Sequence, residues 1–360
     1  MRETLRSLLP DVYATILPEL FDRPTPSETK ATCANCAMCA SGGASAEGAT
    51  YFRPDAKCCT YHPVLPNYLV GAILADPREE MAEGQRRIRA KIEARMAVSP
   101  HWIAAPRKTS VLLRASREHA FGRSLALLCP YFEREGGRCT IWRHRESVCS
   151  TFFCKYVDGA AGQRFWRAAK DLVAVIERQL ALHAARAILP NHRERWTDDL
   201  TIEDLEDRPP SDASYAALWG DWVGREAEFY VKTSEWVRGL DRAEFERAVV
   251  DEAYESRAAA TAAAHDALSD RTLPERLRPN PAMTRRPVAD GVLVTSYSRY
   301  EPLHLTPALD HAVAAFNLDE PVAEVRARLA REEIHVPDEL IFALYRYRVL
   351  VPEEPTPPSP

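Results

Sequence analysis

Apolar side chains recur every three or four residues over long parts of this chain, which is the spacing of an amphipathic helix. One stripe lies in a highly charged segment before residue 100, and a longer one begins after residue 160 and ends before Pro190. The first consists of Met81, Ile88, Ile92 and Met96, and the second of Phe165, Ala169, Leu172, Ile176 and Leu180. Both stripes predict helices with one buried face.

Capping residues mark two further helices. Ser211 is a candidate N-cap, and Asp241 with Glu244 forms a capping-box-like start. The first helix would carry Tyr215, Leu218, Trp219, Trp222, Phe229 and Trp236, and the second Phe245 and Val249. Tryptophans at helical spacing line either a ligand cleft or a core, and a core is favoured here. The short apolar segment 109–116 predicts a strand.

The pattern changes again near the end of the chain. Strands are expected over 290–297 and 301–305 and again from Val349, with three helices between the second and the third strand. These helices would enclose a small core of Val313, Phe316, Val325, Leu329, Leu340 and Leu344. Because this core is self-contained, the pattern predicts an independent unit.

Together these elements predict a mainly α protein with minor β structure. We expect a cysteine-rich domain over residues 1–160, a helical region over 161–285 and a winged-helix-like module over 286–352. The segment 273–287 is rich in proline and arginine and is interpreted as a connector. The proline-rich residues 353–360 are predicted to be a disordered tail.

Composition and charge indicate a soluble globular protein. Hydrophobic residues make up 46% of the chain and charged residues 28%, and the formal net charge is −5. The charge gives no sequence-wide basic signal for nucleic acid. Glu3 and Asp11 interrupt the N-terminus where a signal peptide would be apolar, and the apolar stretch 68–75 is too short to span a bilayer. We therefore expect a cytoplasmic protein without a membrane partner.

Nine cysteines, all between residues 33 and 154, are the strongest chemical signal in the sequence. In a reducing compartment clustered thiols indicate metal binding before disulfides. The candidate ligands are Cys33, Cys36, Cys39, Cys58, Cys59, Cys129, Cys139, Cys149 and Cys154. The first three are separated by two residues each, a spacing that lets neighbouring sulfur atoms face one ion.

The type of metal remains open at this stage. The repeated two-residue spacing occurs in loops that bind iron–sulfur clusters, and Cys129 is followed by Pro130, another feature of such loops. A four-thiolate zinc site would use the same ligands. We therefore expect an iron–sulfur cluster, in particular a 4Fe-4S cluster, or zinc. His62 and His144 lie a few residues from cysteines and are weaker candidate ligands.

The spacing of the later cysteines resembles the YkgJ-type cysteine-cluster family, which is described as zinc- or iron-chelating and includes flagellin lysine N-methylases. The matching positions are Cys129, Cys139, Trp142, Arg145, Cys149 and Cys154, and Cys33, Cys36 and Cys39 match the start of the family pattern. The resemblance covers roughly residues 30–160 and implies metal binding without specifying an activity.

Two positions depart from that family pattern. The family has a fourth cysteine where this chain has Ala40, and a proline where it has Glu146. We interpret the glycine- and alanine-rich segment 40–56 as an insertion, after which Cys58 or Cys59 replaces the missing ligand.

Three functions follow as hypotheses. The first is a metal-binding protein with a structural or redox role and a peptide or protein partner. The second is a lysine N-methylase-like enzyme that modifies a peptide or protein, although no S-adenosylmethionine motif is identifiable. The third is a metal-responsive regulator, which the acidic character of segment 329–348 disfavours. The C-terminal pattern weakly resembles PqqD-like domains, which implies that a peptide adds to a strand edge.

Overall fold

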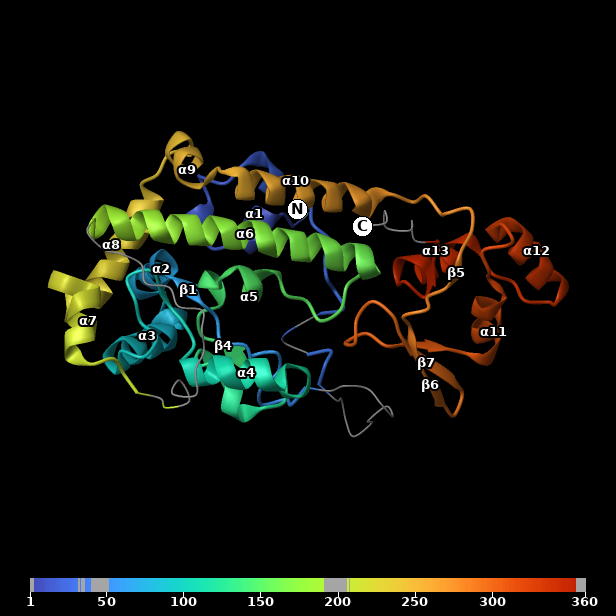
Figure 1. The fold of residues 1–360 in the computed structure, drawn as a ribbon, viewed down its shortest axis with the longest axis horizontal. Coiled ribbons are helices and arrows are strands. Elements are labelled where there is room, and N and C mark those ends of the chain that lie inside the picture. The colour runs from blue at the N-terminus through green and yellow to red at the C-terminus, as the bar shows by residue number, and fades with distance from the viewer. Residues whose placement is uncertain are drawn as a thin grey trace, which may run out of the picture.

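The computed structural model describes residues 3–31, 33, 36–39, 52–190, 206 and 208–353. Most of the predicted insertion and residues 354–360 of the predicted tail lie outside this part. The described chain is mainly helical with small sheets, as predicted (Figure 1). Its α-helices are α1 Leu5–Leu8, α2 Asn67–Ala75, α3 Ala82–Ala94, α4 Arg107–Ala120, α5 Ser147–Thr151, α6 Gly159–Ile188, α7 Asp212–Trp219, α8 Glu226–Arg238, α9 Arg242–Val249, α10 Glu252–Ser269, α11 Pro307–Ala315, α12 Val322–Arg331 and α13 Asp338–Arg346.

The strands are short and pair in small antiparallel sheets. β1 with β2 and β3 with β4 form two-stranded pairs near the cysteines, and β5 pairs with β9 near the C-terminus. A three-stranded sheet has the order β6–β7–β8. The strands are β1 Leu65–Pro66, β2 Trp102–Ile103, β3 Phe132–Glu133, β4 Arg138–Cys139, β5 Arg278–Pro279, β6 Thr284–Val288, β7 Gly291–Thr295, β8 Leu303–Leu305 and β9 Leu350–Val351.

Helix α6 is the central support of the molecule. The predicted stripe is its buried face, and α10 lies alongside it (Figure 1). The N-terminal segment packs into the same core through Leu5, Tyr13 and Phe21. The N-terminal segment and α10, which lie far apart in the sequence, therefore both cover α6.

A second core lies where α2 packs against α8. Helix α2 is buried from Asn67 to Leu74, and α3 adds Ile88 to this core. Trp219 and Phe229, from the aromatic segment, are fully buried in it. The tryptophan spacing thus reports mainly core packing, the interpretation favoured from the sequence.

Both cores take residues from either side of residue 160, and that position lies inside α6. The predicted division between residues 1–160 and 161–285 therefore does not correspond to separate cores. The physical reason is that α6 and α8 bury their apolar faces against α2 and the N-terminal segment. Neither set of segments forms a core without the other.

Two local predictions are wrong, and one helix was not predicted. The single helix expected after Ser211 is two, because α7 ends at Trp219 and α8 begins only at Glu226. Segment 109–116 is part of helix α4 and not a strand; Val111 and Leu113 are half-buried there, and Leu112 is exposed. Helix α10 was not predicted, because its alanine-rich sequence buries few side chains and forms no apolar stripe.

Residues from Leu277 onwards form a third core, which we call the C-terminal unit (residues 277–352). From β7 onwards its strands and helices follow the predicted order, and the buried side chains include Val313, Val325 and Leu329. The supposed connector 273–287 contributes β5 and β6. Pro287 does not prevent β6 from pairing because β6 is an edge strand of its sheet.

Candidate metal centre

All nine cysteines lie in the described part of the chain as free thiols. Cys33 is exposed, Cys129 is buried, and the other seven are partly buried. Cys139 lies on β4 and Cys149 on α5, and the others lie on turns, bends and irregular segments; α5 itself packs against α6. Short irregular segments thus carry most of the thiols, and the packed helices support them.

The three groups of cysteines converge in space. Loss of water around the thiol to surrounding protein atoms is the main cause that raises the pKa of five cysteines, including the exposed Cys33. Proximity to Cys58 is a further cause for each of the five: Cys33, Cys39, Cys129, Cys139 and Cys154. These five come from the first group and from the later group. Cys58 is therefore the common neighbour of thiols that lie far apart in the sequence.

Hydrogen bonds to backbone carbonyls hold these segments together. The Lys57 ammonium donates to the Cys33 carbonyl at 3.0 Å and to the Gly137 carbonyl at 2.7 Å, which connects the first group to the β3–β4 hairpin. The Cys129 N–H donates to the Cys59 carbonyl at 2.8 Å. The Lys57 side chain and one backbone hydrogen bond thus connect the three groups.

The guanidinium of Arg145 lies among thiols of all three groups. Burial lowers its pKa, and Cys139, Cys149, Cys33 and Cys58 raise it. The guanidinium donates to the Cys149 carbonyl at 2.9 Å and stacks 3.4 Å from the Trp142 ring centroid. A cation in this position would offset the negative charge that several thiolates retain around a metal.

Glu146, the departure from the family pattern, has a local structural role. Its carboxylate caps α5 by accepting the N–H groups of Val148 at 2.6 Å and Cys149 at 3.1 Å. A proline would remove this cap. Glu177 from α6 accepts the Ser147 N–H at 2.8 Å, so two buried acids position the helix that carries Cys149. Burial raises the pKa of both carboxyl groups.

The thiols are poor anions in the absence of a cation. Burial raises the pKa of Cys129 and of Cys154 to about 12. Burial and the neighbouring Cys36 raise the pKa of Cys39 to about 12 as well. Because metal ligands are thiolates, binding of a cation would have to release these protons.

In the part of the chain described, no group of three or more His, Cys, Asp or Glu side chains is placed to hold a metal ion as it stands. The donor chemistry nevertheless fits, since thiolates are the preferred ligands of zinc and of iron–sulfur clusters. A metal would therefore have to draw neighbouring sulfur atoms closer together. The ligand set remains a prediction.

The two histidine candidates have other partners. His144 Nε2 lies 2.8 Å from the Asp76 carboxylate, which also accepts a bond of 2.6 Å from Arg78. His62 Nε2 lies 3.5 Å from the Lys91 ammonium, beside the Tyr131 ring. Both imidazoles thus have a place in the packing that needs no metal.

Acidification should destabilise the protein through His62. Burial lowers the pKa of this imidazole from 6.5 to about 3. Between these values only the unfolded state takes up the proton, so stability is lost as the pH falls below 6.5. From pH 7 to pH 5 the loss amounts to about 2 kcal/mol.

Urea titrations of the wild type and of His62→Gln at the two pH values measure this contribution. Between pH 7 and pH 5, the unfolding free energy of the variant should fall by about 2 kcal/mol less than that of the wild type. His304→Gln, a change at a partly exposed histidine, serves as the control. Equal losses in the wild type and His62→Gln would contradict the assignment.

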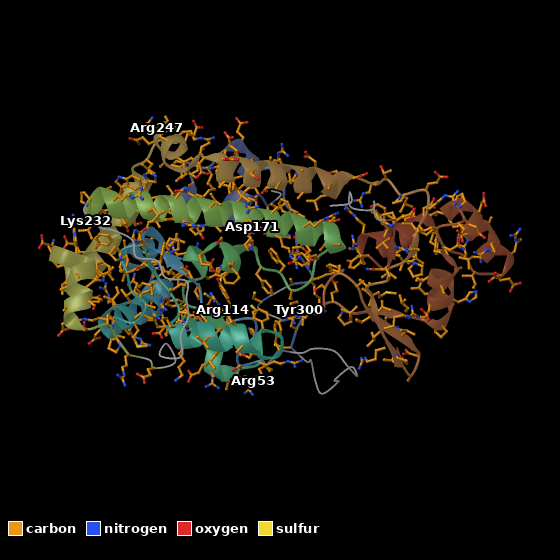
Figure 2. All side chains as sticks on the ribbon, in the orientation of Figure 1. Arg53, Arg114, Asp171, Lys232, Arg247 and Tyr300 are labelled. Carbon is orange, nitrogen blue, oxygen red and sulfur yellow. The ribbon has the colours of Figure 1, made fainter. Side chains whose placement is uncertain are left out.

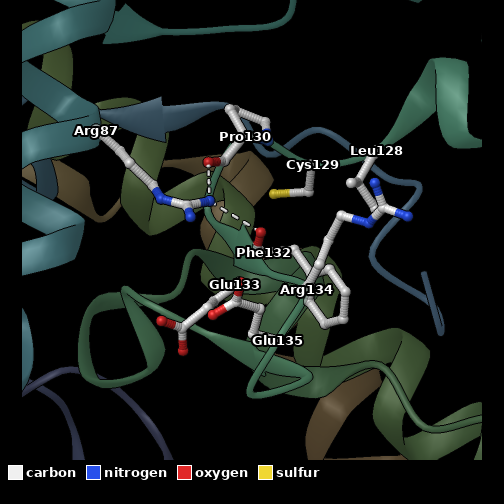
Figure 3. A pocket seen from close by; sticks show the side chains of 8 residues that line it. All are labelled: Arg87, Leu128, Cys129, Pro130, Phe132, Glu133, Arg134 and Glu135. Carbon is white, nitrogen blue, oxygen red and sulfur yellow. Dashed lines mark hydrogen bonds between the residues drawn. The ribbon is translucent and has the colours of Figure 1, made fainter. Parts of the chain in front are cut away.

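A hollow of about 450 Å³ opens beside Cys129 (Figure 3). Arg87 forms one wall and donates to the carbonyls of Pro130 at 2.7 Å and Phe132 at 2.8 Å. Glu133, Arg134 and Glu135 line the rest. Figure 3 shows the Cys129 sulfur between these walls, so the hollow leads from solvent to one of the buried thiols.

Several residues of this site carried no signal in the sequence. Glu177 and Lys91 belong to segments interpreted as helix, and only the fold brings them near the cysteine segments. Glu28 was not singled out, and the fold brings it to Val157, after the last cysteine. Arg145 was recognised as a position of the family pattern, but its position among four thiols was not predictable from spacing.

Comparisons with protein-family models, with curated proteins and with solved structures find no match for this chain. Within the part of the chain that the structure describes, no helix is long and apolar enough to cross a membrane.

Proposed function

We propose that the cysteines form a metal centre that holds zinc or an iron–sulfur cluster, with a 4Fe-4S cluster as the iron form, in a structural or redox role. The ligands would be Cys33, Cys36, Cys39, one or both of Cys58 and Cys59, and Cys129, Cys139, Cys149 and Cys154. Zinc would supply a rigid crosslink, and an iron–sulfur cluster would add electron transfer.

The observation that carries the proposal is the convergence of separate cysteine groups on Cys58 and Arg145. Apolar packing alone does not require several thiols from different segments in one place, although single buried cysteines are common. Lys57 and Arg145 add two cations where a thiolate cluster would be negative. Sequence spacing and tertiary position thus support the same chemistry.

Metal analysis of anaerobically purified protein tests the proposal. We expect at least one zinc ion, or iron with acid-labile sulfide, for each chain. A broad visible absorption would identify the iron–sulfur form, whereas zinc protein would be colourless. Reaction with a thiol reagent should be slow before chelation and fast afterwards. Folded, metal-free protein whose thiols react equally with and without chelator would refute the proposal.

The partner is proposed to bind the C-terminal unit. This unit has its own core, and its strand–helix order agrees with a winged-helix-like module. Pro287 removes a backbone donor from β6, so β8 is the edge better suited to pair with an extended peptide. Binding of the full chain to displayed peptides and to duplex DNA would distinguish peptide recognition from gene regulation, and binding to neither would argue against both.

A further inference from the structure

The loop between β7 and β8, residues 296–302, connects the C-terminal unit to the cysteine region. Figure 2 shows its residue Tyr300 between the C-terminal unit and α4. The loop contacts segments that flank the first and the last cysteine. We call it the β7–β8 loop.

Glu301 is the centre of these contacts. Its residue is only 6% exposed, although it carries a carboxylate. The carboxylate accepts a bond of 3.1 Å from the Lys30 ammonium and one of 3.3 Å from the Tyr156 N–H, and Tyr297 of the same loop also donates to it. Lys30 precedes Cys33 by three residues and Tyr156 follows Cys154 by two. One buried acid thus holds both ends of the cysteine region.

Tyr347, at the end of α13, makes a second connection. Its hydroxyl lies 3.0 Å from the Val157 carbonyl and accepts a hydrogen bond from Lys30. At the same place α6 begins so close to α13 that a Cβ on Gly159 would lie 2.6 Å from the Arg346 carbonyl oxygen. The C-terminal unit therefore fits closely onto the segment after Cys154.

Tyr300 makes a third connection, to the first cysteine group. Its ring packs against Phe52 and Phe121, with centroids 5.6 Å and 6.0 Å away. The Phe52 N–H donates to the Met38 carbonyl at 2.7 Å, and Phe52 forms a β-bridge with Cys39. A displacement of Cys39 would therefore move Phe52 and change its packing against Tyr300.

Beside these aromatic contacts, part of the joint between the two parts is polar and incompletely filled. A hollow of about 260 Å³ lies there, lined by Ala160, Gln163, Arg164, Ser296, Tyr297 and Arg348. Polar interfaces of this kind hold domains together less firmly than an apolar core does. Docking of the C-terminal unit thus depends on the correct position of a few hydrogen-bonding groups.

We propose that metal binding by the cysteines and docking of the C-terminal unit are thermodynamically linked through Glu301 and the β7–β8 loop. This inference rests on the proposed metal centre. Metal fixes the segments that carry Lys30 and Tyr156, and these segments hold Glu301. Loss of metal frees them and releases the C-terminal unit. Linkage is reciprocal, so weakening the joint must lower metal affinity by the factor by which metal strengthens docking.

Limited proteolysis and hydrogen exchange of the full chain, with zinc alone or a reconstituted iron–sulfur cluster, test the linkage. Removing the metal should increase exchange in residues 296–301 and cleavage in residues 270–276 about tenfold, within the usual range of coupling between sites. Glu301→Gln should show the same increase with metal present, and its metal affinity should be about tenfold lower.

Two further variants complete the experiment. Lys30→Met removes a partly exposed partner of Glu301 and should have the same effects if Glu301→Gln fails to fold. Glu332→Gln makes the same change within the C-terminal unit at the His311 pair and should change nothing.

The outcomes separate the two proposals. Metal binding without any change in exchange or cleavage would overturn the linkage and leave the metal centre intact. A wild-type chain that binds no metal would refute both.

Discussion

Replacing Cys149 by serine should loosen the segment around Cys33 as well as α5. Cys149 and Cys33 are both neighbours of Arg145, although the two thiols belong to different groups. If one metal centre joins the groups, the free energy of metal binding stabilises the folded form of both groups. Structural zinc sites contribute on the order of 10 kcal/mol to the free energy of folding. We therefore expect much of the metal content to be lost and the unfolding free energy to fall by several kcal/mol.

Hydrogen exchange measured by mass spectrometry locates the effect. Protection should fall over residues 28–39 and 57–60, not only over 145–154. Val148→Ala is the matched control, because it truncates a neighbouring side chain on α5 and keeps all nine thiols. Loss of protection limited to 145–154 would show that the cysteine groups bind metal independently.

Replacing Gly71 by alanine should destabilise the protein by about 3 kcal/mol or more, near the upper end for overpacking. Gly71 is on α2 where it crosses α8, and a Cβ there would lie 1.8 Å from the Tyr230 carbonyl oxygen and 2.9 Å from Ser234 Cβ. The carbonyl belongs to helical backbone and cannot move aside alone. The two helices would have to separate, which would open the second core.

Urea denaturation of Gly71→Ala measures this cost. Gly239→Ala is the control, because its Cβ would lie 3.4 Å or more from other atoms in ordinary contact. That change should be neutral or slightly stabilising, as alanine restricts the unfolded chain. A Gly71→Ala protein with an unfolding free energy within about 0.5 kcal/mol of the wild type would contradict the observed helix crossing.

Local sequence signals predicted the elements whose stability is local. The Asp241–Glu244 capping box is formed as expected, and Ser211 caps α7. The stripe of α6 is buried along its length because a helix places every third or fourth residue on one face. Helix α10 lacked such a signal, since it is held by packing along α6 and buries few residues of its own.

The sequence by itself determined the helical class, the helices with an apolar stripe or a capping residue, and the order of the elements after residue 290. Only the tertiary structure decided that Cys58 neighbours thiols from the other two groups, that Arg145 lies among them and that Glu301 holds the segments beside Cys33 and Cys154. Periodicity and capping act within a few residues, so a single sequence records them directly. Contacts between distant segments depend on how α2, α6 and α8 pack as whole helices, and no local spacing specifies that packing.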